Sequence, residues 1–441
     1  MANAIADTNK THYMDALRGL ATAELPDWAE AVRNDGEARF RDAAMPHNKL
    51  EEWRQTNISA VVNTPYKSLV APGNAMPSAE DIAVHSLGDA DTPELVFVDG
   101  YYAPGLSRTC VLPEGVRVAS LREAVAAGDV AVREHLGQVL GERGAFPALN
   151  TAFLQDGVFL YAPKNTALPA PVHVLFLTTA RESEQAAHIR NLVVLEEGAE
   201  ATLTVTYAGL NSDSAYLNNV VDEIALGANA HLHWHKVVRE GAAGNHLGTT
   251  DVRHGRDSRL SSFVISLAGK VVRNQLCTQL AEEGASCSLS GLYLNDGDRL
   301  IDNALDINHA VPRCSSRIAY KGVLADKSHA VFTGKVYVAR DAQQTDSDQL
   351  SNNLLLSDTA TINAKPQLEI YADDVKCTHG ATVGSPPDEI VFYFRSRGIG
   401  EEAARGMLTF GFAEEVVADI EDKQLRDRLT QYLQTVFRPG I

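Results

Sequence analysis

The run EEGAEATLTV at residues 196–205 opens a series of similar turn-and-strand stretches that decides the fold of this chain. The later members of the series read ALGANAHLHW, RHGRDSRLSS, EEGASCSLSG and VPRCSSRIAY. One residue marks the same place in each stretch, namely Gly198, Gly227, Gly255, Gly284 and Arg313. These marks lie 29, 28, 29 and 29 residues apart. We interpret this interval as one coil of a flattened solenoid with two short strands, because such a coil buries its apolar face only by stacking on its neighbours.

This repeat predicts a mainly β fold with a parallel β-helix as its core. An antiparallel sandwich would also give short strands and frequent turns, but the regularity over four successive intervals favours the solenoid. Up to about residue 150 the apolar residues fall mostly at helical spacings, and helical spacing returns after the Ser-Pro-Pro run at 385–387. We therefore predict an N-terminal mainly helical domain (1–150), a parallel β-helix core (151–384) and a C-terminal helical domain (385–441).

The last predicted helix, at residues 421–437, carries a continuous apolar stripe. Its members are Leu425, Leu429, Tyr432, Leu433, Val436 and Phe437. A stripe of this kind packs against another surface, and we expect most of it to pack on this chain.

Composition excludes several classes of function. The chain has 441 residues, of which 45% are hydrophobic and 22% charged, and its formal net charge is -18. This charge would repel nucleic acid and anionic membranes. The five cysteines include no CxxC pair, which argues against both a disulfide framework and a zinc ribbon. No export signal and no apolar run of about 18 residues is present, so we expect a cytoplasmic protein that binds neither nucleic acid nor membranes.

Cys377 and His379 form a closely spaced pair of metal-ligand types. In an extended backbone, residues two apart face the same side, so a thiolate and an imidazole could converge on one metal. A tetrahedral metal or an iron-sulfur cluster needs about four ligands. The pair therefore predicts a half-site that another chain completes. A buried cysteine beside a hydrogen-bonded histidine would show the same spacing, so spacing alone does not decide between the two.

His231, His233 and His235 in the run HLHWH share one face of a predicted strand, and three imidazoles are a plausible zinc set. Residues two apart on a strand are separated by about 6.5 Å, so three in a row do not easily surround one ion. The alternative is a solvated or partly packed strand face.

Motifs for nucleotides and nucleophilic catalysis are absent or incomplete. The run GIGEEA at 398–403 resembles a dinucleotide fingerprint, but no second strand follows it, and a helix start is the simpler interpretation. The sequence contains neither a GxxxxGK[ST] phosphate loop nor a G-x-S-x-G elbow. We expect no ATP binding in a phosphate loop.

Asp373 and Asp374, followed by the His379-Gly380 step, resemble the paired carboxylates of pectin-degrading β-helix glycosidases. Adjacent strand residues face opposite ways, the chain has only three tryptophans to stack on sugars, and the other elements of such enzymes are missing. A polysaccharide-degrading enzyme of this kind is the alternative function.

Several longer runs resemble the SufD members of the SufB/SufD family, which are scaffold subunits of the SUF iron-sulfur cluster assembly machine. The resemblance extends from about residue 50 to 415. Its motifs are EWRQT (52–56), HAVPRCSS (309–316), YKG (320–322), AVFTG (330–334), NNLLLS (352–357), KPQLEIY (365–371), DDVKCTHGATVG (373–384) and FYFRSRG (392–398). The SufB members share the fold but differ in the tail, and their N-terminal cysteine cluster is absent here.

The resemblance implies a right-handed parallel β-helix flanked by helical domains, and a scaffold rather than an enzyme. It implies pairing with a SufB-like paralogue through the β-helix and binding of a SufC-like ATPase through the C-terminal helices. A transient iron-sulfur cluster would form at the interface with the paralogue, with His379 as a candidate ligand and Cys377 as the neighbouring thiol. An isolated chain could pair with a second copy. A flavin accompanies some complexes of this family, but no flavin motif is found here.

Overall fold

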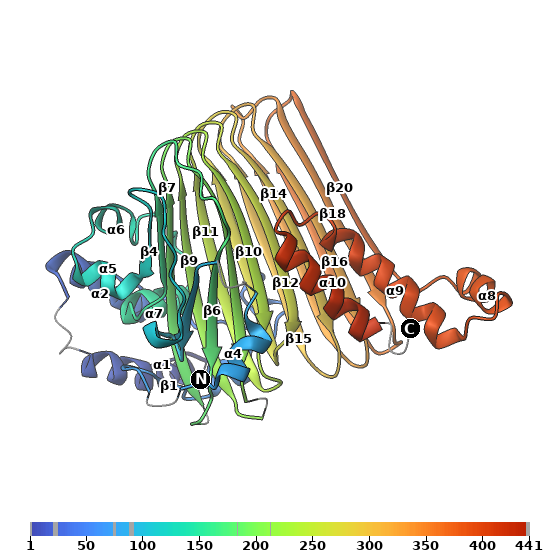
Figure 1. Cartoon of the computed structure of the whole chain (residues 1–441), viewed down its shortest axis with the longest axis horizontal. Coiled ribbons are helices and arrows are strands. Elements are labelled where there is room, and N and C mark those ends of the chain that lie inside the picture. Colours follow the sequence, from blue (N-terminus) through green and yellow to red (C-terminus); the bar gives the residue numbers. More distant parts are fainter. Residues whose placement is uncertain are drawn as a thin grey trace.

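The computed structural model describes residues 2–20, 25–73, 76–87, 92–182, 184–211 and 213–437. At its centre is a parallel β-solenoid, in which the chain passes alternately through two facing sheets (Figure 1). Successive strands of each sheet pair in parallel, for example β10 with β12 and β11 with β13. The predicted parallel β-helix is therefore confirmed, and the antiparallel sandwich is excluded.

Each sheet contains ten strands. In the first sheet the order is β19-β17-β15-β13-β11-β9-β7-β5-β4, and β1 pairs with β7 beside this path. Its strands are β1 Lys67–Ser68, β4 Arg117–Ser120, β5 Val158–Ala162, β7 Gln185–Leu195, β9 Tyr216–Leu226, β11 Gly244–His254, β13 Val271–Leu280, β15 Leu300–His309, β17 His329–Val338 and β19 Thr361–Ile370. In the second sheet the order is β20-β18-β16-β14-β12-β10-β8-β6-β2-β3. Its strands are β2 Glu94–Val98, β3 Tyr101–Tyr102, β6 Val172–Thr178, β8 Glu200–Gly209, β10 His231–Arg239, β12 Arg259–Ala268, β14 Ser286–Asn295, β16 Ser315–Leu324, β18 Thr345–Leu355 and β20 Val375–Gly384.

Side chains alternate between the interior of the solenoid and its outer faces, and residues in register on successive strands form columns. One interior column of the second sheet contains, in order, Leu203, Trp234, Ser262, Leu289, Ile318, Gln349 and His379. Leu203, Trp234, Leu289 and Ile318 of this column belong to the main hydrophobic core. The column therefore leads from an apolar interior to the last strand.

The turns that lead from the first sheet to the second form a ladder along one edge. In five successive turns one residue has positive φ, namely Gly198, Asn229, Asp257, Gly284 and Arg313. The backbone N–H groups of four of them bond across to neighbouring turns, as from Gly198 to the carbonyl of Ala228. The predicted marks Gly198, Gly284 and Arg313 occupy this position.

The other two marks, Gly227 and Gly255, stand two residues before the positive-φ position. A Cβ at Gly227 would lie 2.7 Å from the backbone nitrogen of Glu197, and one at Gly255 would meet the backbone of the preceding turn in the same way. These glycines are thus explained by close approach of the coils, whereas asparagine and aspartate fill the left-handed position, which they tolerate better than most residues. The predicted repeat was wrong by two residues at these two turns.

Most of the N-terminal region covers the outer face of the first sheet over its N-terminal half (Figure 1), whereas Ile82 and Leu106 pack on the outer face of the second sheet. Its helices are α1 Ala2–Gly19, α2 Asp27–Asp42, α3 Ser59–Asn63, α4 Ala79–His85, α5 Leu121–Ala126, α6 Val130–His135 and α7 Ala145–Phe153, with 3-10 turns η1 Glu51–Trp53 and η2 Pro104–Leu106. Asn150 of the buried helix α7 donates to the backbone carbonyls of Ile189 and Asn219. Strands β1, β2 and β4 pair with solenoid strands. The division at residue 150 stays a prediction.

The C-terminal helices are α8 Asp388–Ser396, α9 Glu401–Val417 and α10 Lys423–Phe437. Helices α9 and α10 pack on the outer face of the second sheet, where Leu425, Leu429 and Leu433 join a separate hydrophobic cluster. The predicted stripe thus packs on this chain, although Val436 is exposed. Helix α8 projects away from the solenoid (Figure 1). Among the described helices, none combines the length and apolar character needed to cross a membrane.

Candidate functional site

Strand β20 is the last strand of the second sheet and carries both predicted site residues. Cys377 pairs in register with Ser347, and His379 pairs with Gln349. Both belong to interior columns, so the spacing of two does bring them to one face. The thiol of Cys377 packs at the margin of the main core, whereas His379 is exposed because no further coil covers it.

The preceding strand, β18, turns a row of five polar side chains toward the interior. The row consists of Thr345, Ser347, Gln349, Ser351 and Asn353, each at most 3% exposed. In the equivalent row of β16, Ile318, Tyr320 and Leu324 are part of the hydrophobic core. The second-sheet side of the interior therefore changes from apolar to polar one coil before the open end, while Phe332 and Val336 of β17 keep the first-sheet side apolar. The alternation T-x-S-x-Q-x-S-x-N at 345–353 carries this signal in the sequence, and our sequence analysis missed it.

Gln349 crosses the interior toward the first sheet. Its Nε2 donates to the backbone carbonyl of Gly334 at 3.3 Å, and a Cβ at position 334 would lie 1.9 Å from that nitrogen. A larger residue there would push the amide of Gln349 out of its present position. Gln349 Oε1 is buried without a hydrogen-bond partner among the described residues. An acceptor of this kind beside His379 is suited to hold an imidazole N–H or a ligand.

A second column joins Cys377 to the interior through Ser347, Ser316 and Cys287. Ser316 Oγ donates to Ser347 Oγ at 2.9 Å. Burial raises the pKa of the Cys377 thiol and raises that of Cys287 to about 12. Both thiols are therefore protonated at neutral pH unless a metal binds and displaces the proton.

The rim of the open end combines unpaired strand edges with apolar side chains. Strands β19 and β20 each end their sheet, so one edge of each has no neighbouring strand. Tyr371 is 59% exposed and Val383 is 52% exposed, and Ile370 is also exposed. Such edges are usually blunted or covered, and here the described residues provide no cover.

Two other sequence candidates lie in ordinary structural positions. Asp373 and Asp374 are exposed in the turn before β20, where they do not form the facing pair that a glycosidase needs. The run at 398–403 is a turn followed by the start of α9, with Gly400 preceding the first helical residue. It is a helix start, as predicted.

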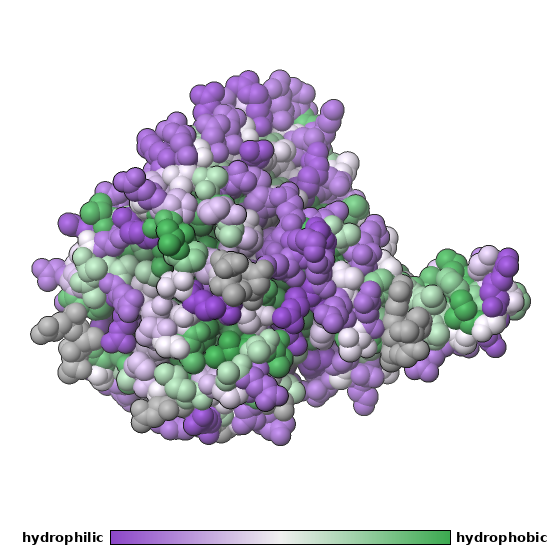
Figure 2. Space-filling view, in the orientation of Figure 1, coloured by the Kyte–Doolittle hydropathy of each residue, from purple (hydrophilic) through white to green (hydrophobic). Residues whose placement is uncertain are grey.

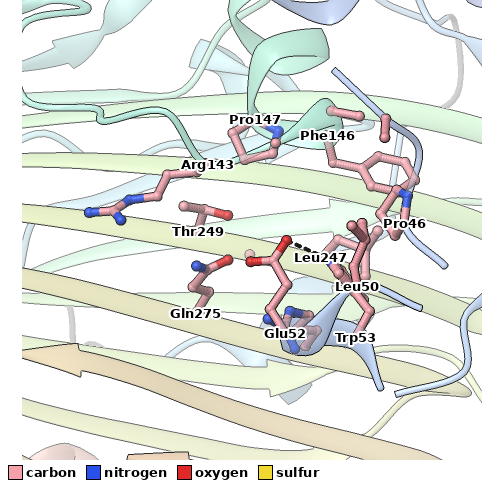
Figure 3. A pocket seen from close by; sticks show the side chains of 15 residues that line it. Pro46, Leu50, Glu52, Trp53, Arg143, Phe146, Pro147, Leu247, Thr249 and Gln275 are labelled. Atoms are coloured by element: carbon pink, nitrogen blue, oxygen red, sulfur yellow. Dashed lines mark hydrogen bonds between the residues drawn. The ribbon is translucent and has the colours of Figure 1, made fainter. Parts of the chain in front are cut away.

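The run at 52–56 lies beside a small pocket on the outer face of the first sheet (Figure 3). The guanidinium of Arg273 lies 4.1 Å from the centre of the Trp53 ring, and Thr56 Oγ1 donates to Asp302 at 2.6 Å. These partners belong to the same chain. The motif therefore attaches the N-terminal region to the sheet.

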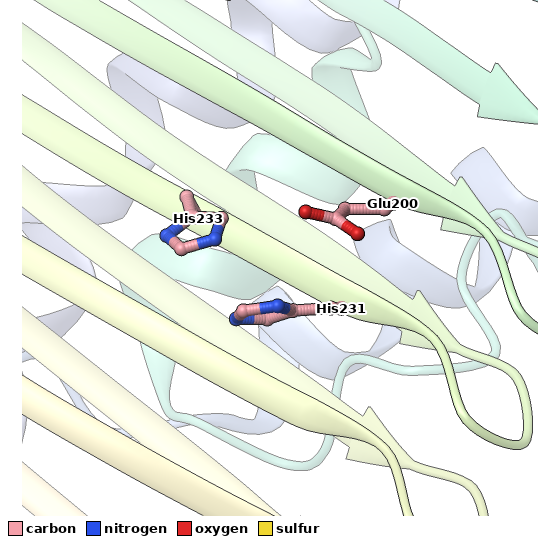
Figure 4. Close-up of side chains that lie close together, drawn as sticks. All are labelled: Glu200, His231 and His233. Carbon is pink, nitrogen blue, oxygen red and sulfur yellow. The ribbon is translucent and has the colours of Figure 1, made fainter. Parts of the chain in front are cut away.

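The three histidines of β10 do not act as one set. His231 and His233 converge with Glu200 of β8, and the ligand atoms of the three side chains all lie within 4.8 Å of one another (Figure 4). His235 is separate, since its Nδ1 lies 3.1 Å from Thr204 Oγ1. Burial lowers the pKa of His235 to about 4. Sequence reasoning identified two of these three ligands and missed Glu200, because its place beside His231 depends on the register of β8 and β10.

Comparison with known proteins gives a consistent result over nearly the whole chain. Residues 176–412 match the family described as SUF system FeS cluster assembly, SufBD core domain, and residues 8–174 match the SufBD protein N-terminal region. The chain is 33% identical to an iron-sulfur cluster assembly SufBD family protein of Synechocystis, over 88% of this chain and 86% of the relative. It is 32% identical to iron-sulfur cluster assembly protein SufD of Escherichia coli, over 87% and 88%. It is 28% identical to protein ABCI7, chloroplastic, of Arabidopsis thaliana, over 95% and 88%.

Proposed function

The chain belongs to the SufBD family of the SUF system for iron-sulfur cluster assembly, and on this premise we propose that it is a non-catalytic SufD-type scaffold that contributes half of a cluster site. The other half would come from a SufB-like paralogue. The cluster is the cargo of the complex, and it is held only transiently. A cytoplasmic location is part of the proposal.

The observation that carries the proposal is an incomplete donor set at an open end. Cys377 and His379 offer one thiol and one imidazole on the interior side of the last strand. Neither belongs to a group of three possible metal ligands among the described residues. A cluster with about four protein ligands would need the remaining donors from another chain.

The rim supports pairing through the β-helix. Unpaired edges of β19 and β20 can hydrogen-bond to strands of a similar solenoid, since main-chain pairing across an edge is a general mode of recognition. Exposed Tyr371 and Val383 add apolar area to the same end. A paralogue with the same coil geometry fits these edges best, and a second copy of this chain is the substitute when the paralogue is absent.

The C-terminal helices support the binding of a SufC-like ATPase. On α8, Phe392 is 71% exposed, and Ile390 and Tyr393 are exposed beside it. Figure 2 shows hydrophobic surface on this projecting helix. An exposed apolar patch on an element that stands away from the body is typical of a docking surface. The patch therefore provides a place for a partner that supplies the ATP hydrolysis for which this sequence has no phosphate loop.

Helix α9 provides a path from that partner to the site. Lys321 of β16 bonds to the backbone carbonyl of Phe412 at 3.1 Å and to the carboxylate of Glu415 at 2.5 Å. Strand β16 is next to β18, which pairs with β20. In the proposal, dimerisation of two ATPase subunits pulls on the C-terminal helices and shifts the last coils, which opens or builds the cluster site.

The test is cluster assembly by the reconstituted complex of this chain with a SufB-like paralogue and a SufC-like ATPase. We expect His379→Ala to lower the amount of iron and sulfide bound and the visible absorption of the cluster. His47→Ala is the matched control, because His47 is an exposed histidine of the N-terminal region. Equal cluster yields from the two variants would reject His379 as a ligand. Failure of the chain to recover either partner in a pull-down would reject the scaffold itself.

A further inference from the structure

The outer face of the second sheet carries a group of metal ligands that the cluster site does not use. Glu200 of β8 pairs directly with His231 of β10, and His233 follows two residues later on the same face. All three side chains point into one space (Figure 4). Among the residues that the structure describes, this is the one group of three His, Cys, Asp or Glu side chains with ligand atoms within 4.8 Å of one another.

The register of the two strands explains how these ligands converge. Three histidines in a row along one strand are too widely spaced to surround an ion, and the third, His235, bonds to Thr204 instead. The third ligand is instead Glu200 of the neighbouring strand, which lies about 4.8 Å away in the sheet. Ligand atoms of a tetrahedral site with bonds of about 2.1 Å lie about 3.4 Å apart. The ligand atoms now lie within 4.8 Å of one another, so binding would require side-chain rotations, and the Glu200 side chain is exposed.

Two polar side chains beside the group are placed to orient a ligand or to add a donor, although Arg259 pairs in register with His231 on the other side. Ser261 Oγ lies 3.2 Å from one ring nitrogen of His231, and a hydrogen bond to one nitrogen is how proteins usually orient a ligating imidazole. Glu421 Oε2 lies 3.4 Å from His233 Nε2. A pocket beside the group is lined by His233, Ser261 and Glu421. A fourth donor, Glu421, is thus within reach of the group.

We propose that Glu200, His231 and His233 bind one divalent cation of the borderline class, Zn²⁺ or Fe²⁺, and that Glu421 completes the site. Two imidazoles and a carboxylate suit both ions. Glu421 lies between α9 and α10, so the cation would connect the C-terminal helices to β8 and β10. This site is independent of Cys377 and His379, which lie on the interior side of β20.

The first experiment is a binding titration of the full-length chain without an affinity tag, after removal of metal by chelation. Zn²⁺ is added in air and Fe²⁺ under anaerobic conditions, and Co²⁺ serves as a spectroscopic probe of the ligand set. We expect one cation per chain. The Fe²⁺ and Zn²⁺ arms decide which ion the site prefers.

Three variants assign the ligands. Glu200→Gln and His231→Gln change exposed or half-exposed side chains and should each weaken binding at least about tenfold. Glu421→Gln should weaken it less, because its side chain is 75% exposed. His47→Gln is the control for an unrelated histidine, and His379→Ala is the control for the cluster site.

The outcomes separate the two proposals. Binding that is weakened by Glu200→Gln and His231→Gln but not by His379→Ala supports this site, whatever the result of the cluster assay. The proposal is overturned if the chain binds neither Zn²⁺ nor Fe²⁺, or if only His379→Ala lowers binding. Far-ultraviolet circular dichroism of each variant checks that the fold is retained.

Discussion

His379 lies directly beside Gln349 across the last two strands of the second sheet, in the interior column that ends at the open end of the solenoid. Gln349 is fully buried, and its Oε1 has no hydrogen-bond partner among the described residues. A buried acceptor without a partner costs about 1–3 kcal/mol. Its position next to an exposed imidazole is therefore more easily explained by the function of the site than by stability.

Replacing Gln349 by leucine tests this relationship. Leucine has a similar volume and removes both the orphan acceptor and the bond to Gly334, so we expect the free energy of unfolding to change by less than about 1 kcal/mol. Cluster yield in the reconstituted complex should fall, because His379 loses its polar neighbour. Urea denaturation and bound iron are the two measurements.

Thr345→Val is the matched control, because it also replaces a buried polar residue of β18 by an apolar one of similar shape. Thr345 pairs with Val375, away from His379. Equal cluster yields from the two variants would remove Gln349 from the site.

Because Gly334 and Gln349 are in contact, we expect substitutions at these two positions to have strongly coupled effects on the free energy of unfolding. An alanine at 334 would bring its Cβ against the amide, 1.9 Å from Nε2, and force the buried side chain out of its place. We expect Gly334→Ala to destabilise the chain by about 1–3 kcal/mol. In the double variant with Gln349→Ala, most of that loss should disappear. A double-mutant cycle by urea denaturation measures the coupling, and simple additivity would contradict the structure.

The rate of thiol alkylation measures how accessible Cys377 is, both in the free chain and when a partner covers the open end. Cys110 is exposed, Cys377 is half-buried, and the other three cysteines are buried. Burial raises the pKa of Cys377, so its thiolate fraction at neutral pH is small and its alkylation should be slow. The thiolate is the reactive form. At pH values below that pKa, the alkylation rate should therefore increase about tenfold for each unit by which the pH is raised.

Alkylation followed by peptide mass spectrometry should therefore label Cys110 first and Cys377 second. Cys277, Cys287 and Cys314 should react only on unfolding. In the complex with a SufB-like paralogue, Cys377 should become protected while Cys110 does not. Unchanged labelling of Cys377 in the complex would contradict pairing at this end.

The periodic parts of the fold were predictable from the sequence, because each coil repeats one local pattern. The prediction failed where glycine serves two different structural purposes. Gly227 and Gly255 look like Gly198, yet they allow close packing of the coils, while Asn229 and Asp257 adopt the left-handed conformation. A single sequence does not separate a glycine needed for space from one needed for φ.

The sites were predictable only where their residues are neighbours along the chain. Cys377 and His379 share a face because they are two apart on one strand. Glu200 meets His231 through a register that joins residues 31 positions apart, and Gln349 meets His379 in the same way. Pairs of this kind depend on the register between stacked coils, and the repeat in the sequence does not fix that register to the residue.

Acid should destabilise the chain through His188. Its two ring nitrogens lie 2.9 Å from Ser68 Oγ and 3.1 Å from Asn219 Nδ2, and Phe153 stacks on the ring at 4.2 Å. Burial lowers the pKa of His188 to about 3 in the folded state, against about 6.5 in the unfolded chain. Because the unfolded state binds the proton more readily, stability is complete above pH 6.5 and decreases as pH falls toward 3.

The loss from this histidine is at most about 1.4 kcal/mol for each pH unit in that window. His188→Gln keeps a neutral polar side chain that has no proton to gain. Urea denaturation at pH 5 and pH 7 should show a smaller difference for the variant than for the wild type. A difference of the same size would mean that His188 is not a source of the acid sensitivity.

The last prediction concerns the attachment of the C-terminal helices, on which the proposed path from the ATPase to the site depends. Leu433 is fully buried in the cluster between α10 and the second sheet, whereas Val436, three residues later on the same helix, is exposed. Leu433→Ala should cost about 2–5 kcal/mol, because it leaves a cavity in this cluster. Val436→Ala should cost less than about 0.5 kcal/mol. Hydrogen exchange separates local from global effects: we expect faster exchange in α9 and α10 of Leu433→Ala, with unchanged protection of the middle strands. If the solenoid strands lose protection to the same extent, the helices and the sheet form one cooperative unit. A pull on the helices would then reach β20 through the whole sheet and not through the contact at Lys321.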